Sequence, residues 1–239
     1  MTGEAAALRD AVARYHDILG DGALAADTHA RMEEEHRRRG MYFGDRPLCS
    51  VLRPRFLTPQ QFRGIRSGVE TLMRAFHTAH EAAMADPEFL RQFRLLEWEE
   101  ELLHADPGFR EPSPTARLDA FFTPEDGSLR FTEYNAETPA GPAYMDQLSD
   151  VFMATPAMGE FLKTHAVQPL PAQHGVLHAL LGAYRQFSGR RELPRIGILD
   201  WSDVPTQSEF VFFRDYFRSH GIQAEIHDPR ECEYREGRL

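Results

Sequence analysis

Four polar side chains in residues 117–135 have the types and the spacing to surround a metal ion. They form an R-x-D and an E-x-N motif and are Arg117, Asp119, Glu133 and Asn135. Hard divalent cations such as Mg2+ prefer carboxylate and amide oxygens as ligands. The sequence therefore predicts Asp119, Glu133 and Asn135 as metal ligands, provided that the fold brings them together.

Two strands joined by a tight turn would do so. RLDAFFT (117–123) and LRFTEYN (129–135) alternate as strands do, and the PEDGS between them is rich in turn residues. We expect Thr123 to pair with Leu129. Continuing this register puts the four polar residues on one face in two directly opposed pairs, Asp119 with Glu133 and Arg117 with Asn135. Two opposed acids repel each other unless a cation lies between them.

The other face of this hairpin is expected to carry both apolar and polar side chains. It would carry Leu118, Ala120, Phe122, Arg130, Thr132 and Tyr134, while Phe121 and Phe131 lie beyond the polar patch. Because side chains alternate between the faces, a slip of one residue would scatter the polar group over both. A surface hairpin with a mixed polar face is the alternative interpretation of the same pattern.

The bulk composition is typical of a soluble globular protein. The 239 residues suffice for one large domain or two small ones, and 42% are hydrophobic and 27% charged. A net charge of -10 argues against a general nucleic-acid binder, which needs a basic surface to meet phosphates. The sequence shows neither a signal-peptide pattern nor an apolar run long enough to span a bilayer. We expect a cytoplasmic protein without nucleic-acid or membrane partners.

Helical periodicity dominates the first hundred residues. Helices are expected at 4–19, 23–39 and 59–85, with short helical pieces at 87–93 and 94–104. Thr58, Pro59 and Gln61 have the pattern of a capped helix start. This helical region needs something to pack on, and the sheet containing the hairpin is the natural candidate.

The pattern changes near residue 195. Helices at 144–154, 156–165 and 172–187 are followed by RIGILDW (195–201), a short apolar run suited to a buried strand. A helix at 206–219 and a strand at IQAEIH complete a βαβ unit, the start of a parallel sheet. The fold class is thus α+β to α/β. We expect two domains: a helical region plus hairpin in 1–168, and the start of a Rossmann-like domain in 169–239.

Two other groups of residues are weaker candidates. Glu33-x-x-His36 and Glu101-x-x-His104 match part of the di-iron helical-bundle signature, but charged, solvated helix faces are the simpler interpretation. Asp200, Trp201, Asp203 and Thr206 follow a predicted parallel strand, where open α/β sheets bind ligands. A loop with a helix cap at Thr206 or Ser202 explains that stretch equally simply.

The hairpin motif resembles a known family. R-x-D, a short turn and E-Y-N-A-x-T-P are similar to the metal-binding hairpin of glutathionylspermidine synthetases and other circularly permuted ATP-grasp ligases; eukaryotic glutathione synthetase has a similar arrangement. The resemblance implies that Glu133 and Asn135 bind Mg2+ on the phosphates of ATP, with help from Asp119. It also implies that Arg117 stabilises charge on the acyl phosphate or tetrahedral intermediate. It covers 115–142 at motif level and 195–239 more weakly.

The activity that this resemblance implies is ATP-dependent ligation of a carboxylate to an amine or thiol. Family members also hold ATP with lysines and a glycine-rich loop that follow the substrate domain, whereas the single lysine here, Lys163, precedes it. We therefore expect the N-terminal part of a longer ligase, with partial ATP-grasp architecture and no activity by itself. The alternative is a non-catalytic ligand-binding or scaffold module that retained the hairpin.

Overall fold

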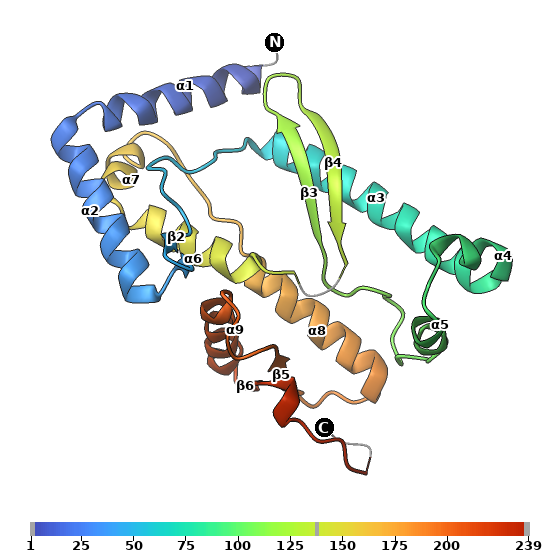
Figure 1. Ribbon diagram of the computed structural model, residues 1–239. Helices are drawn as coiled ribbons and strands as arrows, with labels where there is room; N and C mark the ends of the chain where they lie inside the picture. The colour runs from blue at the N-terminus through green and yellow to red at the C-terminus, as the bar shows by residue number, and fades with distance from the viewer. Residues whose placement is uncertain (1–2, 137–138, 237–239) are drawn as a thin grey trace. The chain divides into compact units, whose positions relative to one another are not determined.

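The protein has a mixed α+β fold of many helices and small sheets. The computed structural model describes residues 3–136 and 139–236 (Figure 1). The chain divides into two compact units assembled from separate segments. Unit 1 comprises Met1–Ala5, Leu57–Pro139 and Ala179–Arg191, and unit 2 comprises Ala6–Phe56, Ala140–His178 and Glu192–Leu239. The division into residues 1–168 and 169–239 stays a prediction.

Unit 1 is built around a long helix, α3 (Pro59–Ala85), and the hairpin of β3 (Arg117–Thr123) and β4 (Ser128–Asn135). The predicted helix start is confirmed: the Thr58 hydroxyl accepts a hydrogen bond from Gln61 N at 3.1 Å, and Gln61 Oε1 accepts one from Thr58 N at 3.0 Å. The other elements are α4 (Pro87–Leu90), η1 (Arg91–Phe93), α5 (Glu97–Leu103) and the C-terminal part of α8 (Ala172–Ser188).

One face of the hairpin packs on α3, as expected (Figure 1). The Phe76 and Tyr134 rings stack with their centroids 4.3 Å apart. At Gly68 a Cβ atom would lie 2.8 Å from Leu129 Cδ2, so the absence of a side chain there admits the leucine. Gln61 Nε2 also donates to Pro124 O in the turn at 3.0 Å. The helix therefore fixes which face of the hairpin is covered.

Unit 2 has an aromatic core formed by Tyr15, Phe56 and Phe161, whose ring centroids lie 5.1 to 5.5 Å apart. Its elements are α1 (Gly3–Leu19, from Ala6), α2 (Gly22–Arg39), β1 (Tyr42–Phe43), β2 (Arg46–Pro47), α6 (Pro142–Met153), α7 (Pro156–Phe161), the first residues of α8, β5 (Arg195–Leu199), α9 (Gln207–Ser219), β6 (Gln223–His227) and η2 (Pro229–Glu231). The short β1–β2 pair was not expected.

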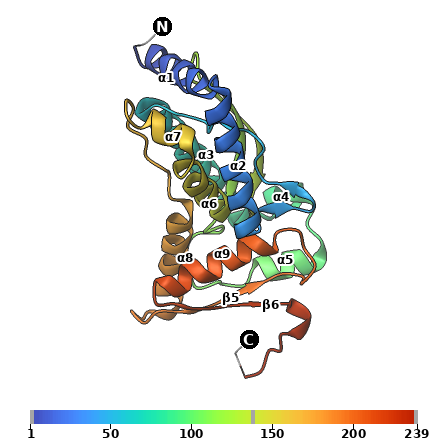
Figure 2. The ribbon, with the colours of Figure 1, turned by 90° about the vertical axis from the view of Figure 1, so that its left-hand side faces the viewer.

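The predicted βαβ unit is present. Strands β5 and β6 pair in parallel, with Arg195 opposite Gln223 and Leu199 opposite His227, and α9 lies against them (Figure 2). The prediction of a buried strand is wrong, because Leu199 is 43% exposed and no residue of β5 is fully buried. Within the described residues this sheet has two strands, so β5 has a single neighbour.

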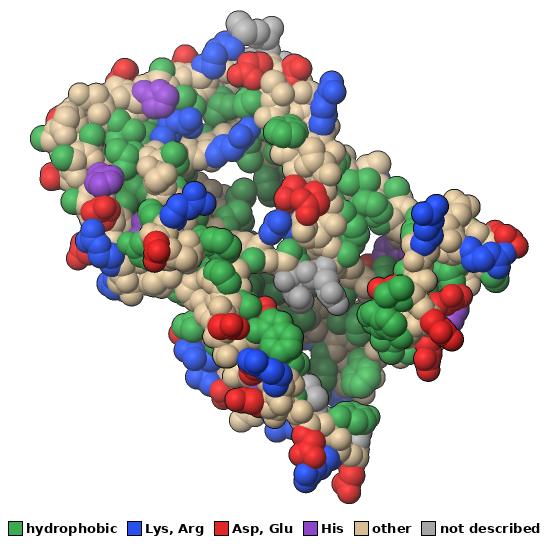
Figure 3. All heavy atoms as spheres, in the orientation of Figure 1, with side chains coloured by type: hydrophobic (Ala, Val, Ile, Leu, Met, Phe, Trp, Pro, Cys, Tyr) green, Lys and Arg blue, Asp and Glu red, His purple; other side chains and the backbone are tan. Residues whose placement is uncertain are grey.

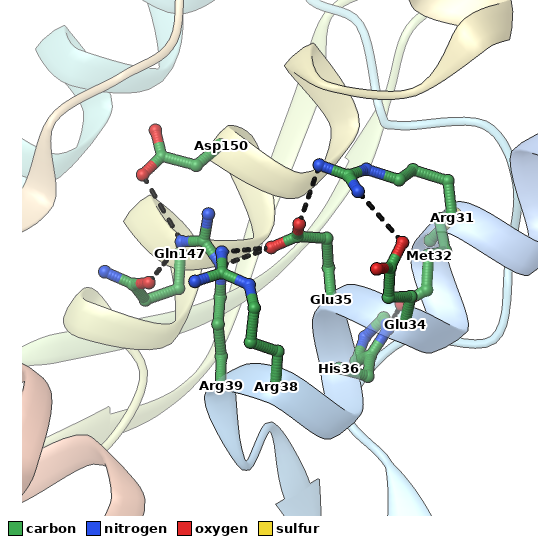
Figure 4. Close-up of polar contacts among 9 residues, drawn as sticks. All are labelled: Arg31, Met32, Glu34, Glu35, His36, Arg38, Arg39, Gln147 and Asp150. Carbon is green, nitrogen blue, oxygen red and sulfur yellow. Dashed lines mark hydrogen bonds and ion pairs between the residues drawn. The ribbon is translucent and has the colours of Figure 1, made fainter.

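A buried carboxylate connects α2 with α6 (Figure 4). The Glu35 side chain is 3% exposed and forms ion pairs with Arg31, Arg38 and Arg39. The Arg39 guanidinium continues to Gln147 on α6 and lies 3.5 Å from an Asp150 carboxylate oxygen. Within EEEHRRR, the buried Glu35 thus holds Arg39, and Arg39 makes the contacts with α6.

No helix in the described part of the chain combines the length and the apolar character needed to cross a bilayer.

Candidate metal site on the hairpin

The strand register brings the four predicted polar residues together. β3 and β4 are antiparallel, with Asp119 opposite Glu133 and Arg117 opposite Asn135. Directly opposed residues project from the same face of a sheet. This part of the predicted register is confirmed, and acidic and basic side chains reach the surface over the middle of the hairpin (Figure 3).

The register changes at a β-bulge between this pair and the turn. Ala120 is opposite Phe131 and Asp119 is opposite Glu133, so Thr132 is an extra residue on β4. Its hydroxyl donates to Asp119 O at 3.1 Å. The expected pairing of Thr123 with Leu129 is therefore wrong, because Thr123 is opposite Ser128.

The bulge also changes which residues share a face. Regular alternation on β3 places Leu118, Ala120 and Phe122 on the side of α3, together with their partners Tyr134, Phe131 and Leu129. Arg130 is opposite Phe121 and so shares the face of Asp119 and Glu133. The predicted placements of Arg130 and Phe131 were wrong. The prediction assumed a register without a bulge, and between the bulge and the turn such a register assigns each β4 residue to the opposite face.

Arg117 and Asp119 form a close ion pair. Arg117 Nε lies 2.8 Å from Asp119 Oδ1, and Nη2 lies 3.5 Å from Oδ2. The guanidinium thus supplies part of the positive charge that two opposed acids require. Glu133 is exposed and makes no hydrogen bond or ion pair with residues 3–136 or 139–236. Its carboxylate is available to a ligand.

Asn135 completes the polar group from the end of β4. Its amide Nδ2 is buried and has no hydrogen-bond partner among the described residues. A buried polar atom without a partner costs about 1–3 kcal/mol, so a native structure normally supplies a partner. Rotating the amide by 180° exchanges its nitrogen and oxygen. The same position can then present an oxygen to a cation.

These residues fit a Mg2+ ion that keeps several other ligands. Asp119, Glu133 and Asn135 offer two carboxylates and an amide, and Mg2+ is commonly bound by one or two protein carboxylates plus waters and phosphate oxygens. A protein-only cage is not present: no group of three or more His, Cys, Asp or Glu side chains in the described chain could hold a metal ion. A Mg2+ ion at these residues would take its remaining ligands from water or from a bound anion.

The residues of the di-iron alternative do not form a group that could hold a metal ion in the part of the chain that the structure describes. Glu33 forms an ion pair with Arg37 at 2.8 Å, and His36 Nδ1 is 2.7 Å from Met32 O. The solvated-face interpretation is also wrong for His36, which is buried within unit 2.

The loops after β5 and β6 form a second polar group, which the sequence predicted only in part. Asp228 accepts hydrogen bonds from Ser202 N at 3.2 Å and from Arg230 Nε at 2.8 Å, and the Arg230 guanidinium lies 4.9 Å from the Trp201 ring centroid. Asp228 and Arg230 were missed, although HDPRE directly follows the second predicted strand. Thr206, one of the two expected cap residues, occupies the N-cap position of α9, but its side chain makes no capping hydrogen bond.

Comparisons with protein-family models, with curated proteins and with solved structures found no match to this chain. The family resemblance therefore stays a prediction from the sequence motif of the hairpin.

Proposed function

We propose that the hairpin is the metal-binding edge of an ATP- and Mg2+-dependent carboxylate–amine (or thiol) ligase of the circularly permuted ATP-grasp type. The observation that carries this proposal is the strand pairing, which places Asp119 opposite Glu133 and Arg117 opposite Asn135. These four residues lie on the face of the hairpin that α3 does not cover. The open face supports the proposal because a substrate has to reach these side chains from solvent.

In this proposal Glu133 and Asn135 hold the metal through oxygen atoms, and Asp119 assists. A bound Mg2+ neutralises charge on phosphate oxygens during phosphoryl and acyl transfer. Arg117 stabilises negative charge on the acyl phosphate, or on the tetrahedral species formed when the amine attacks it. The amine then displaces phosphate from the acyl group.

The contact between Asp119 and Arg117 supports different roles for the two carboxylates, Asp119 and Glu133. Two donor atoms of the guanidinium face the two oxygens of one carboxylate, which restricts its orientation. Asp119 is therefore proposed chiefly as a positioning residue for Arg117. Glu133, which has no such partner in the described chain, is the stronger candidate for direct metal binding.

The same ion pair also favours the second candidate function, a non-catalytic ligand-binding or scaffold module. Arg117 neutralises Asp119 without any metal, so the hairpin can be stable as a purely structural element. The two functions differ in what they require of Glu133.

Phosphate release from ATP, measured on the protein that carries this chain, separates them. We expect Glu133→Ala to lower the Mg2+-dependent rate about 100-fold or more, because the metal that neutralises charge on the phosphate oxygens loses a ligand. Glu125→Ala, which removes an exposed carboxylate from the turn of the same hairpin, serves as the control and should leave the rate unchanged. Equal rates for Glu133→Ala and the wild type would favour the scaffold module.

A further inference from the structure

A second arginine, Arg130, lies on the same face of the hairpin as the proposed metal ligands. It is opposite Phe121, which follows Asp119 by two residues on a strand without a bulge of its own. Residues two apart on a strand project from the same face. Arg130 and Asp119 are therefore diagonal neighbours, and a long side chain can reach across such a diagonal.

The bulge at Thr132 is what directs Arg130 to this face. Without the extra residue, the pairing of Asp119 with Glu133 would place Arg130 on the side covered by α3. The hydrogen bond from the Thr132 hydroxyl to Asp119 O fixes the bulge beside the polar pairs. Bulges commonly redirect a side chain next to a functional site.

The surface around Arg130 is open. Its partner Phe121 is 74% exposed, so none of the described elements covers this end of the face. Arg130 is itself exposed and has no hydrogen bond or ion pair with the part of the chain that the structure describes. Asp126 in the turn accepts a hydrogen bond from Ser128 N at 2.8 Å, and the charge of Arg130 adds a smaller contribution that also lowers the pKa of Asp126. Arg117, in contrast, forms an ion pair with Asp119.

The charges on this face favour a polyanion once a metal is bound. Arg117 and Arg130 balance Asp119 and Glu133, and the turn adds the carboxylate of Asp126, on which the charge of Arg130 acts, so a bound Mg2+ would leave the group with one positive charge. The Arg130 pair lies two residues, about 7 Å, from the Asp119 pair along the strands. A linear polyphosphate whose oxygens contact the metal can extend over that distance toward the turn.

We propose that Arg130 binds a phosphate group of the polyphosphate ligand, on the turn side of the metal. This rests on the metal site of the proposed function and adds a residue to it. The guanidinium contributes charge-assisted hydrogen bonds to phosphate oxygens, and its planar fork suits that geometry.

Binding of inorganic tripolyphosphate with Mn2+ to the 239-residue chain tests this role. Calorimetric titration with the Mn2+–tripolyphosphate complex should show Arg130→Gln weakening binding about tenfold or more. Arg63→Gln removes the same charge from an exposed arginine on α3 and should change the affinity less than twofold. Arg130→Lys should retain part of the affinity, because it keeps the charge but not the fork.

Binding of Mn2+ alone, followed by electron paramagnetic resonance, distinguishes the possible failures. Intact Mn2+ binding in all variants, together with equal tripolyphosphate affinities for Arg130→Gln and Arg63→Gln, would overturn the role of Arg130 and leave the metal site standing. A wild-type chain that binds no Mn2+ would overturn the proposed metal site and the role of Arg130 with it.

Discussion

Replacing Glu209 with alanine is expected to lower the free energy of unfolding by about 3 kcal/mol, because a charge-assisted cap at the start of α6 is lost. Glu209 is 1% exposed. Its carboxylate accepts hydrogen bonds from Gly141 N at 2.8 Å and from Ala143 N at 3.0 Å. The N-cap residue, Gly141, has no side chain of its own to satisfy these donors. The negative charge also lies at the positive end of the helix dipole.

Glu209→Gln keeps one acceptor oxygen but loses the charge, so we expect about half of that destabilisation. Glu225→Gln provides a control, because this exposed residue pairs with Arg218 at the surface and should cost less than about 1 kcal/mol. Urea unfolding at neutral pH measures all three variants. A Glu209→Ala protein as stable as Glu225→Gln would show that Glu209 does not cap α6 in solution.

Replacing Glu35 with glutamine is expected to cost about 2–3 kcal/mol at neutral pH and to remove an acid-sensitive part of the stability. The hydrogen bond from Arg38 lowers the pKa of Glu35, burial opposes this, and Arg39 lowers the pKa further. A carboxyl whose pKa is lower in the folded state stabilises the fold above its unfolded value, about 4.3. That contribution disappears as the pH falls from there through the folded pKa.

The stabilities of the wild type and Glu35→Gln should therefore begin to converge as the pH falls below about 4.3, and they should meet below the folded pKa of Glu35. Glu34→Gln is the matched control on the same helix, since Glu34 is 63% exposed and pairs only with Arg31 among the described residues. It should cost less than about 1 kcal/mol and keep the pH dependence of the wild type. A difference between wild type and Glu35→Gln that stays constant from pH 7 to pH 3 would contradict the ion-paired state of Glu35.

Local signals in the sequence predicted most elements, because those elements depend on local chemistry. Thr58, Pro59 and Gln61 specify a helix start through hydrogen bonds within one turn. This feature needs no knowledge of distant segments. The opposed pairs Asp119 with Glu133 and Arg117 with Asn135 were also predicted, but from a register without a bulge; with Thr123 opposite Ser128, they form only because the bulge at Thr132 shifts the register.

The bulge at Thr132 could not be predicted in the same way. Pairing Asp119 with Glu133 in a regular hairpin would turn Leu129 and Phe131 away from α3. The extra residue shifts the register, so that the polar pairs form and Leu129 and Phe131 still face α3. Gly68 admits Leu129, and this contact joins residues 61 positions apart in the chain. A register argument confined to the hairpin contains no information about α3, so it placed Arg130 on the wrong face.

Buried charge was the other feature beyond sequence reasoning. EEEHRRR predicts a solvated helix face, yet α6 covers the side that carries Glu35. Its burial is tolerated because arginines three and four residues away neutralise its charge. Helical periodicity alone does not show which side of a charged helix a second helix will cover. Glu209 likewise binds Gly141, which lies 68 residues earlier in the chain.

Binding of Mn2+ to the hairpin, followed by electron paramagnetic resonance with Mg2+ as the competitor, tests the central claim most directly. We predict that the wild-type chain binds Mn2+, that Mg2+ displaces it, and that Glu133→Ala weakens binding about 10- to 100-fold, whereas Glu125→Ala does not. Equal Mn2+ binding by Glu133→Ala and Glu125→Ala would contradict a metal site at Asp119, Glu133 and Asn135.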